Sequence, residues 1–148
     1  MQQVRKALIG LLLAAALLIV GYYLYMRLIG NARVIEELRG DPTGPRAARV
    51  MLITLPDGRN YPVNFLREGD RVYLGVDGLW WRAFRGTAQP VTLLIRGETT
   101  SGRALAILDD PVRTEAVFAR LRPSAPTWLP GRMRGVLVEV TLDDTTGE

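Results

Sequence analysis

The sequence contains no cysteine and no histidine, and its only serines are Ser101 and Ser124. The absence of cysteine excludes disulfides, thiolate metal sites and cysteine nucleophiles. The absence of histidine removes the commonest general base and the commonest metal ligand, so a Ser–His triad is impossible. Few catalytic mechanisms remain open to this chain without a cofactor.

Lysine is also scarce, because Lys6 is the only lysine among nineteen basic residues. The formal net charge of +4 suggests a basic protein, but from Arg46 onward fourteen arginines stand against twelve acidic residues. A nucleic-acid-binding surface needs a clustered basic stripe, which this mixed pattern lacks. We therefore expect no nucleic-acid partner.

Charge is missing altogether from the twenty residues Ala7–Met26, ALIGLLLAAALLIVGYYLYM. At about 1.5 Å per helical residue this run spans about 30 Å, the thickness of the hydrocarbon core of a bilayer. A cleaved signal peptide is the rival interpretation, because the short polar head at residues 1–6 is basic and Gly30-Asn31-Ala32 resembles a cleavage site. Signal h-regions are shorter, about 7–15 residues. The sequence therefore predicts a single-pass transmembrane helix at residues 7–26, in contact with the lipid bilayer.

The same run carries small residues that favour helix packing. Gly10 and Ala14 form a small-xxx-small pair, and Gly21 allows a further close approach. These residues predict integral-membrane protein subunits as partners, although glycine and alanine are also simply common in membrane helices. Residues expected at the membrane–water interface lie at the end of the run: Tyr22, Tyr23 and Tyr25.

The flanking charges bear on orientation. Arg5 and Lys6 precede the run, whereas Arg27, Arg33 and Arg39 follow it. Only lysine and arginine count in the positive-inside rule, and the two sides differ by one charge. We expect a cytoplasmic C-terminal domain.

Residues 27–45 are interpreted as a stalk helix and a linker. Leu28–Leu38 keeps a helical rhythm, Gly40 ends it, and Asp41-Pro42-Thr43-Gly44-Pro45 is typical of a linker. The helix either lies at the headgroup level or continues the membrane helix. Glu36 and Glu37 fit poorly with an anionic lipid surface, which favours a stalk or a partner contact.

The rest of the chain, 46–148, predicts one extramembrane domain of short strands. The expected strands are Arg49–Leu55, Tyr61–Leu66, Val72–Val76, Val91–Ile95, Arg103–Leu108 and Gly135–Leu142. Two short helices are expected at Leu79–Phe84 and from an N-cap at Asp110 to about Arg122. The fold class is mainly β (α+β): a transmembrane helix followed by a small six-stranded antiparallel split barrel.

One long segment resembles a known family. It reads ITLPDGRNYPVNFLREGDRVYLGVDGLWWRAFRGTAQPVTLLIRG and is followed by a GxA-type strand and by LDDP before a helix. This order resembles the split-barrel flavin-binding superfamily, and within it the deazaflavin-dependent nitroreductases, which are related to pyridoxamine-phosphate oxidases. The resemblance covers roughly residues 49–142.

The resemblance implies an oxidoreductase that holds a flavin or deazaflavin in a groove, often between two subunits. The family's cofactor loops are reduced here. The loop after the first strand holds one arginine, and the stretch before the tryptophan helix shrinks to Val76-Asp77-Gly78. The resemblance leaves these cofactor-binding candidates: Arg59, Trp81, Arg82 and Arg85. A solvated or interfacial face is the alternative interpretation of Arg82 and Arg85.

Two further tryptophans are candidate partner contacts. Trp80 stands beside the arginines of the short helix, and Trp128 lies in a proline-rich loop. Exposed tryptophan next to arginine is typical of the centre of a protein interface.

Three functions remain open. The first is a single-pass accessory subunit, without catalysis or cofactor, that stabilises a larger integral-membrane complex, hypothetically a photosynthetic or respiratory one. The second is a membrane-anchored flavin- or deazaflavin-dependent oxidoreductase acting on nitro compounds or quinones. The third is a small-ligand-binding module. Fold alone does not choose between them.

Overall fold

The computed structural model describes residues 1–125 and 135–143, apart from the side chains of residues 26–28. Its elements are α1 (Gln2–Gly40), β1 (Val50–Thr54), β2 (Asn60–Glu68), β3 (Arg71–Val76), the 3-10 helix η1 (Leu79–Phe84), β4 (Gln89–Ile95), β5 (Glu98–Ile107), α2 (Pro111–Leu121) and β6 (Val136–Leu142). The chain divides into two compact units, Met1–Glu36 and Glu37–Glu148. Each is described by itself.

The first unit holds most of α1, which runs without interruption from Gln2 to Gly40, so that its last residues, from Glu37 onward, belong to the second unit. Among the described residues, α1 is the one helix that is long and apolar enough to cross a membrane. Soluble core helices and signal sequences can also reach this length and apolarity, but the apolar part of α1 is fully exposed in the isolated chain. The stalk segment continues the apolar helix, the second of the two expected arrangements, and the helix ends at the predicted Gly40.

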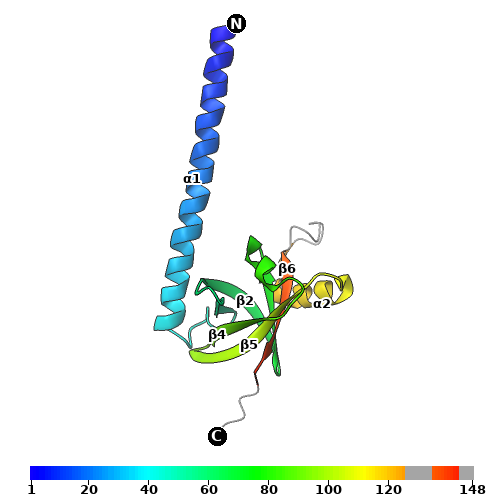
Figure 1. Cartoon of the computed structure of the whole chain (residues 1–148). Helices are drawn as coiled ribbons and strands as arrows, with labels where there is room; N and C mark the ends of the chain where they lie inside the picture. The colour runs from blue at the N-terminus through cyan, green and yellow to red at the C-terminus, as the bar shows by residue number, and fades with distance from the viewer. Residues whose placement is uncertain (126–134, 144–148) are drawn as a thin grey trace. The chain divides into compact units, whose positions relative to one another are not determined.

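The second unit is a closed antiparallel barrel with the strand order β1-β2-β3-β6-β5-β4 (Figure 1). The pairing of β1 with β4 closes it, with Ile53 opposite Leu93. Closure removes the free sheet edges that would otherwise template aggregation. The predicted α+β class with a six-stranded antiparallel barrel is confirmed.

Alternation of side chains along the strands builds the barrel. In β4 the side chains of Val91, Leu93 and Ile95 point inward and are buried, whereas Thr92 is exposed. A period of two places successive side chains on opposite faces of a sheet, so every second residue of β4 belongs to the core. The six expected strands are all present.

The predicted strand boundaries differ from the structure by at most two residues, except at the start of β5, where the prediction was wrong by more. The strand expected at Arg103–Leu108 begins five residues earlier, at Glu98, and ends at Ile107. A two-residue turn joins it to β4, with positive φ at both Arg96 (50°) and Gly97 (84°), as the tight turns of β-hairpins require. The first half of β5 is polar and has no apolar alternation, so only its pairing with β4 reveals it as a strand.

The barrel interior is filled by side chains from all six strands and by Phe84 from η1. The fully buried large residues of the two core clusters are Phe84, Met51, Ile53, Leu74, Leu93, Leu137, Val72, Val76, Val138 and Val140. In a barrel of this size, close-packed side chains fill the interior and leave no room for a ligand. A binding site in this domain must therefore lie on the outer surface.

The helix α2 packs on the outside of the barrel (Figure 1). As predicted, Asp110 caps it: the carboxylate Oδ1 accepts from the backbone N–H of Arg113 at 2.9 Å, and Pro111 occupies the first turn. Val117 and Phe118 form a second apolar cluster with Tyr73 and Leu137.

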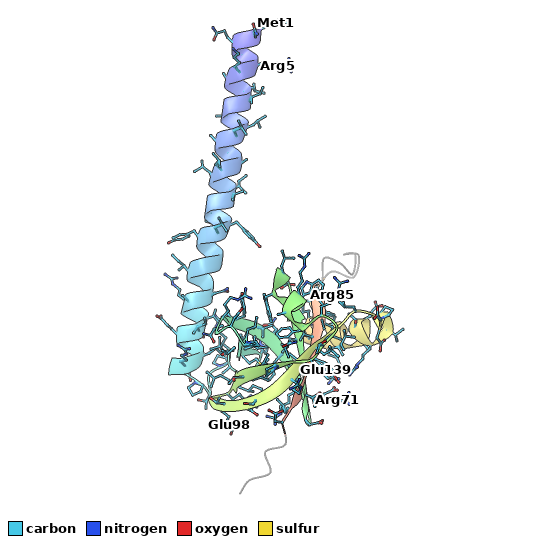
Figure 2. The ribbon with its side chains drawn as sticks, viewed as in Figure 1. Met1, Arg5, Arg71, Arg85, Glu98 and Glu139 are labelled. Atoms are coloured by element: carbon cyan, nitrogen blue, oxygen red, sulfur yellow. The ribbon has the colours of Figure 1, made fainter. Side chains whose placement is uncertain are left out.

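Close approach of α2 to β3 depends on Gly75. A Cβ atom at this position would lie 2.8 Å from Phe118 Cε1, closer than carbon atoms approach without displacement. An ion-pair cluster holds the other end of the contact: Glu139 of β6 pairs with Arg113 and, at 3.4 Å, with Arg71 Nη1 (Figure 2). Arg113 also donates to the Tyr73 hydroxyl at 3.2 Å. Apolar packing and these ion pairs together hold α2 against the outer surface of the barrel.

Candidate functional site

The candidate cofactor residues gather around η1, the short helix predicted from LWWRAF. The Tyr61 and Trp80 rings stack in parallel, with centroids 4.7 Å apart and planes 3° apart. The edge of Phe84 meets Trp80 at 6.0 Å with an interplanar angle of 85°. Aromatic pairs in these geometries contribute about 0.5–1.5 kcal/mol each beyond their burial. Trp80, the predicted partner contact, is therefore half-buried and packed against the barrel core.

Arg59 lies in the β1–β2 turn with its charge already paired. Its Nη2 and Nε atoms both lie 2.7 Å from Asp57 Oδ2, and its Nη1 donates to the Tyr61 hydroxyl at 3.2 Å. The backbone N–H of Arg59 and its guanidinium hold the pKa of Asp57 below its ordinary value, and that carboxylate in turn raises the pKa of Arg59. A phosphate would have to compete with Asp57 for this guanidinium.

Trp81, Arg82 and Arg85 lie at the end of η1. Trp81 is half-buried against the core, and the Arg82 guanidinium lies 6.0 Å from the centre of its ring. Arg82 and Arg85 are exposed (Figure 2 labels Arg85), and neither forms an ion pair within the part of the chain that the structure describes. These two guanidinium groups remain available to an anion or to a partner.

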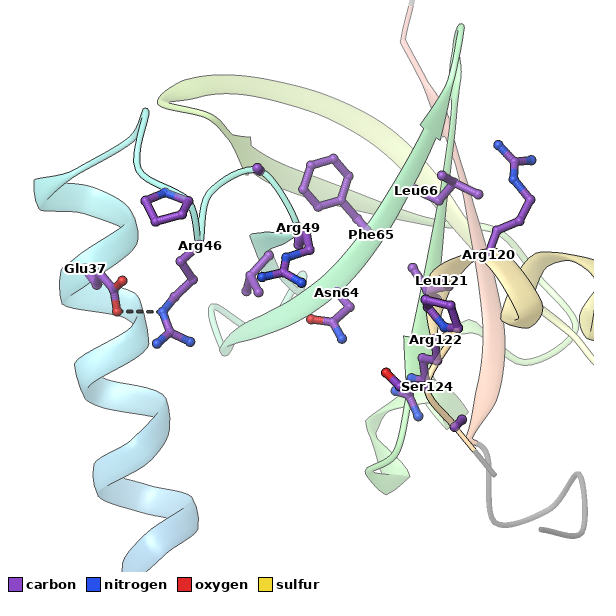
Figure 3. Close-up of a pocket in the computed structure, with 15 residues that line it drawn as sticks. Glu37, Arg46, Arg49, Asn64, Phe65, Leu66, Arg120, Leu121, Arg122 and Ser124 are labelled. Carbon is purple, nitrogen blue, oxygen red and sulfur yellow. Dashed lines mark hydrogen bonds and ion pairs between the residues drawn. The ribbon is translucent and has the colours of Figure 1, made fainter. Parts of the chain in front are cut away.

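Two surface pockets lie elsewhere on the barrel domain. The larger, of about 880 Å³, is lined by the segment before β1, by Asn64–Leu66 of β2 and by the C-terminal end of α2 (Figure 3). We call it the arginine groove, after Arg46, Arg49, Arg120 and Arg122 in its lining. The smaller, of about 590 Å³, lies where β1, β4 and β5 meet and includes Thr54, Thr92 and Arg103. Arg59, Trp81, Arg82 and Arg85 line neither pocket.

The residues predicted for helix packing and the membrane interface are exposed along α1. They are Gly10, Ala14, Gly21, Tyr22, Tyr23 and Tyr25. A Cβ atom at Gly10 or Gly21 would meet nothing within 4 Å. Trp128, the other predicted partner contact, falls outside the described residues. Within those residues, no group of three or more His, Cys, Asp or Glu side chains could hold a metal ion.

Sequence reasoning missed the arginine groove. Arg46 and Arg49 stand more than 70 residues before Arg120 and Arg122, and each pair alone looks like ordinary solvated charge. The only local signal is their spacing, in RAAR and RLR. The folded barrel brings the two pairs to one groove, which no local pattern predicts.

The closed strand order and the outer helix define the class of this domain: a small six-stranded antiparallel barrel with one helix packed on its outer surface. No protein-family model matches the chain, and no curated protein matches it. Several solved structures are similar to it at low identity.

A protein assigned as a pyridoxamine 5'-phosphate oxidase from Listeria innocua has 17% identity and a TM-score of 0.47, over 64% of this chain and 84% of that one. The flavocytochrome Anf3 from Azotobacter vinelandii has 17% identity and a TM-score of 0.46, over 64% of this chain and 58% of its own length. A FAD-binding protein from Mesorhizobium loti has 17% identity and a TM-score of 0.42, over 72% of this chain and 88% of that one. Likeness at this level carries no argument about what this chain binds or does.

Proposed function

We propose that this protein is a single-pass accessory subunit that stabilises a larger integral-membrane complex through α1, with the barrel as a non-catalytic extramembrane domain. The observation that carries the proposal is the exposed, uncharged surface of α1. From Ala7 to Tyr25 every residue is exposed, with leucines such as Leu11 and Leu17 more than 70% accessible. Apolar surface costs about 25 cal/mol per Å² to keep in water, so lipid or protein must cover this helix.

The positions of the small residues favour protein as part of that cover. At about 100° per residue, Gly10, Ala14 and Gly21 fall within about 40° of one another around the helix axis. They form one face on which another helix could approach closely, since van der Waals packing drives helix association in lipid. Ala16 lies about 200° from Ala14, on the opposite side.

The state of the barrel supports a role without catalysis. Its interior is filled with apolar side chains. Arg59, the cation that the family resemblance places in the cofactor loop, is bound by Asp57 and Tyr61. Trp80 stacks on Tyr61. These side chains are used in contacts within the fold, which suits a rigid structural module.

A second candidate function is the membrane-anchored flavin or deazaflavin oxidoreductase. The observation that favours it is the pair of exposed guanidinium groups of Arg82 and Arg85 beside the half-buried Trp81. Arginine pairs of this kind bind phosphate groups well. If these residues hold a cofactor, it would supply the redox chemistry, and the arginines would orient its anionic part.

The test is gentle solubilisation of the full chain from its native membranes, followed by size separation, subunit analysis and an absorption spectrum. The accessory role predicts stoichiometric copurification with membrane subunits and no flavin or deazaflavin absorbance. A yellow or fluorescent preparation would refute it in favour of the oxidoreductase. Recovery of the chain alone, without colour, would refute both roles.

A matched pair of variants tests the packing face. Ala14→Leu adds bulk on the face that holds Gly10 and Gly21, whereas Ala16→Leu makes the same change on the opposite side. We expect Ala14→Leu to reduce the yield of the complex and Ala16→Leu to leave it unchanged, with equal amounts of both chains in the membrane. Equal yields of complex would contradict this choice of face.

A further inference from the structure

The arginine groove has an excess of positive charge. Among the described residues, its lining includes four arginines and one acidic residue, Glu37. The other polar side chains in this described lining are Asn64 and Ser124 (Figure 3). Its volume of about 880 Å³ lies in the range of about 300–1,000 Å³ that small-molecule sites occupy.

Three of the arginines are held in place by acidic partners. Arg46 Nε lies 2.6 Å from Glu37 Oε2, inside the groove. Arg120 pairs with Glu68, and Arg122 Nη1 lies 2.7 Å from Asp77 Oδ1. Glu68 and Asp77 are not among the lining residues, so they orient two guanidinium groups from outside the groove. Preorganised cations lose less entropy on binding an anion.

Arg49 differs from these three. It is exposed in the groove and forms no ion pair with any described residue. Its backbone is fixed, because its carbonyl oxygen accepts from the Phe65 N–H at 3.1 Å. An uncompensated guanidinium on an ordered backbone, between paired arginines, is suited to a charge-assisted contact with an anion.

The rest of the lining is apolar. Val50, Phe65, Leu66 and Leu121 contribute to it from β1, β2 and α2, and all four of these side chains are half-buried. A ligand that only carried charge would leave this surface uncovered. A ligand with an anionic group and an apolar body would meet both kinds of surface.

We propose that the arginine groove binds an anionic small molecule that has a phosphate-type group and an apolar body, with Arg49 as the main contact of the anion. The headgroup region of an anionic lipid and a soluble organic phosphate share this chemistry. This binding is separate from the packing of α1 and does not depend on the accessory role.

The test uses the full chain in nanodiscs of phosphatidylcholine, titrated with phenyl phosphate by calorimetry. Two further compounds are titrated for comparison: benzyl alcohol, which has an apolar body but no charge, and inorganic phosphate, which has the charge but no apolar body. We expect phenyl phosphate to bind more tightly than either, and less tightly as salt is added. Hydrogen exchange should slow in residues 45–50 and 120–125 when it binds. Absence of phenyl phosphate binding, or equal binding of benzyl alcohol, would overturn the proposal.

Variants with opposite expected effects sharpen the test. Arg49→Gln should weaken phenyl phosphate binding by roughly tenfold, the usual effect of one charge-assisted hydrogen bond. Arg67→Gln is the matched control, because Arg67 is an exposed arginine on β2, next to the groove-lining residues Asn64–Leu66, but does not itself line the groove. Glu37→Gln removes an acidic group from the groove and should strengthen binding by up to about fivefold. Equal affinities for Arg49→Gln and Arg67→Gln would overturn the assignment to this groove.

A second arm distinguishes the source of the anion. If the natural ligand is a lipid headgroup, nanodiscs that also contain phosphatidic acid should slow hydrogen exchange in residues 45–50 and 120–125 before any phenyl phosphate is added. The same nanodiscs should then abolish the binding of phenyl phosphate. Unchanged phenyl phosphate binding in those nanodiscs assigns the groove to a soluble organic phosphate.

Discussion

Replacement of Phe84 by alanine should severely destabilise the barrel. Phe84 has 0% exposure and joins η1 to the barrel core. Loss of the ring removes about 2–3 kcal/mol of burial and about 0.5–1.5 kcal/mol of edge contact with Trp80, and the cavity adds to both. The total expected loss is about 3–5 kcal/mol, as is usual for this substitution in a core. A domain of this size has only about 5–15 kcal/mol in all.

The assay is urea unfolding of the full chain in detergent, followed by tryptophan fluorescence. All three tryptophans lie beyond α1, so the signal reports on the barrel domain. Leu79→Ala is the matched control, because Leu79 belongs to the same short helix but is 68% exposed. It should change the free energy of unfolding by less than about 0.5 kcal/mol. A loss below about 1 kcal/mol for Phe84→Ala would refute the view that Phe84 is a core residue.

Two further predictions concern charge. Glu139→Gln should lower the free energy of unfolding by about 1–2 kcal/mol, between the values for exposed and buried ion pairs, because Glu139 is 14% exposed and its partner Arg113 is 32% exposed. Denaturant unfolding measures this loss, and Glu98→Gln, at an exposed position, is the control. Equal losses for the two variants would contradict the prediction. Arg59 lowers the pKa of Asp57, so the Asp57 carboxylate stabilises the fold above its unfolded pKa and loses this effect as the pH falls through its folded pKa. Asp57→Asn should therefore flatten the fall in stability from about pH 5 to about pH 2, and an unchanged slope in unfolding midpoints would contradict it.

The two proposals assign different surfaces of the molecule to different tasks. The face of α1 that holds Gly10 and Gly21 would contact membrane subunits, whereas the arginine groove would bind an anion. Arg82 and Arg85 belong to neither surface, and they remain the residues that would carry the oxidoreductase alternative. The solubilisation experiment and the phenyl phosphate titration therefore fail or succeed independently.

Local signals in the sequence determined most of the elements. The uncharged run at 7–26 is part of a long exposed helix, and alternating apolar residues mark the strands. Asp110-Pro111 marks the start of α2, because a cap and a fixed φ act within one turn. Gly58, in the turn after β1, has a φ of 83°, which glycine adopts without strain. Each of these features depends on neighbours a few residues away, which a single sequence displays.

Tertiary structure decided the rest. The polar first half of β5 is a strand only because β4 lies beside it. Arg59 is paired with Asp57, whereas the sequence resemblance placed it among the cofactor-binding candidates. Arg46 and Arg49 share a groove with Arg120 and Arg122 because β1 pairs with β2 and α2 packs against β2 and β3, which joins segments more than 70 residues apart. Contacts across such distances follow from packing of the whole chain, and residue spacing alone carries no information about them.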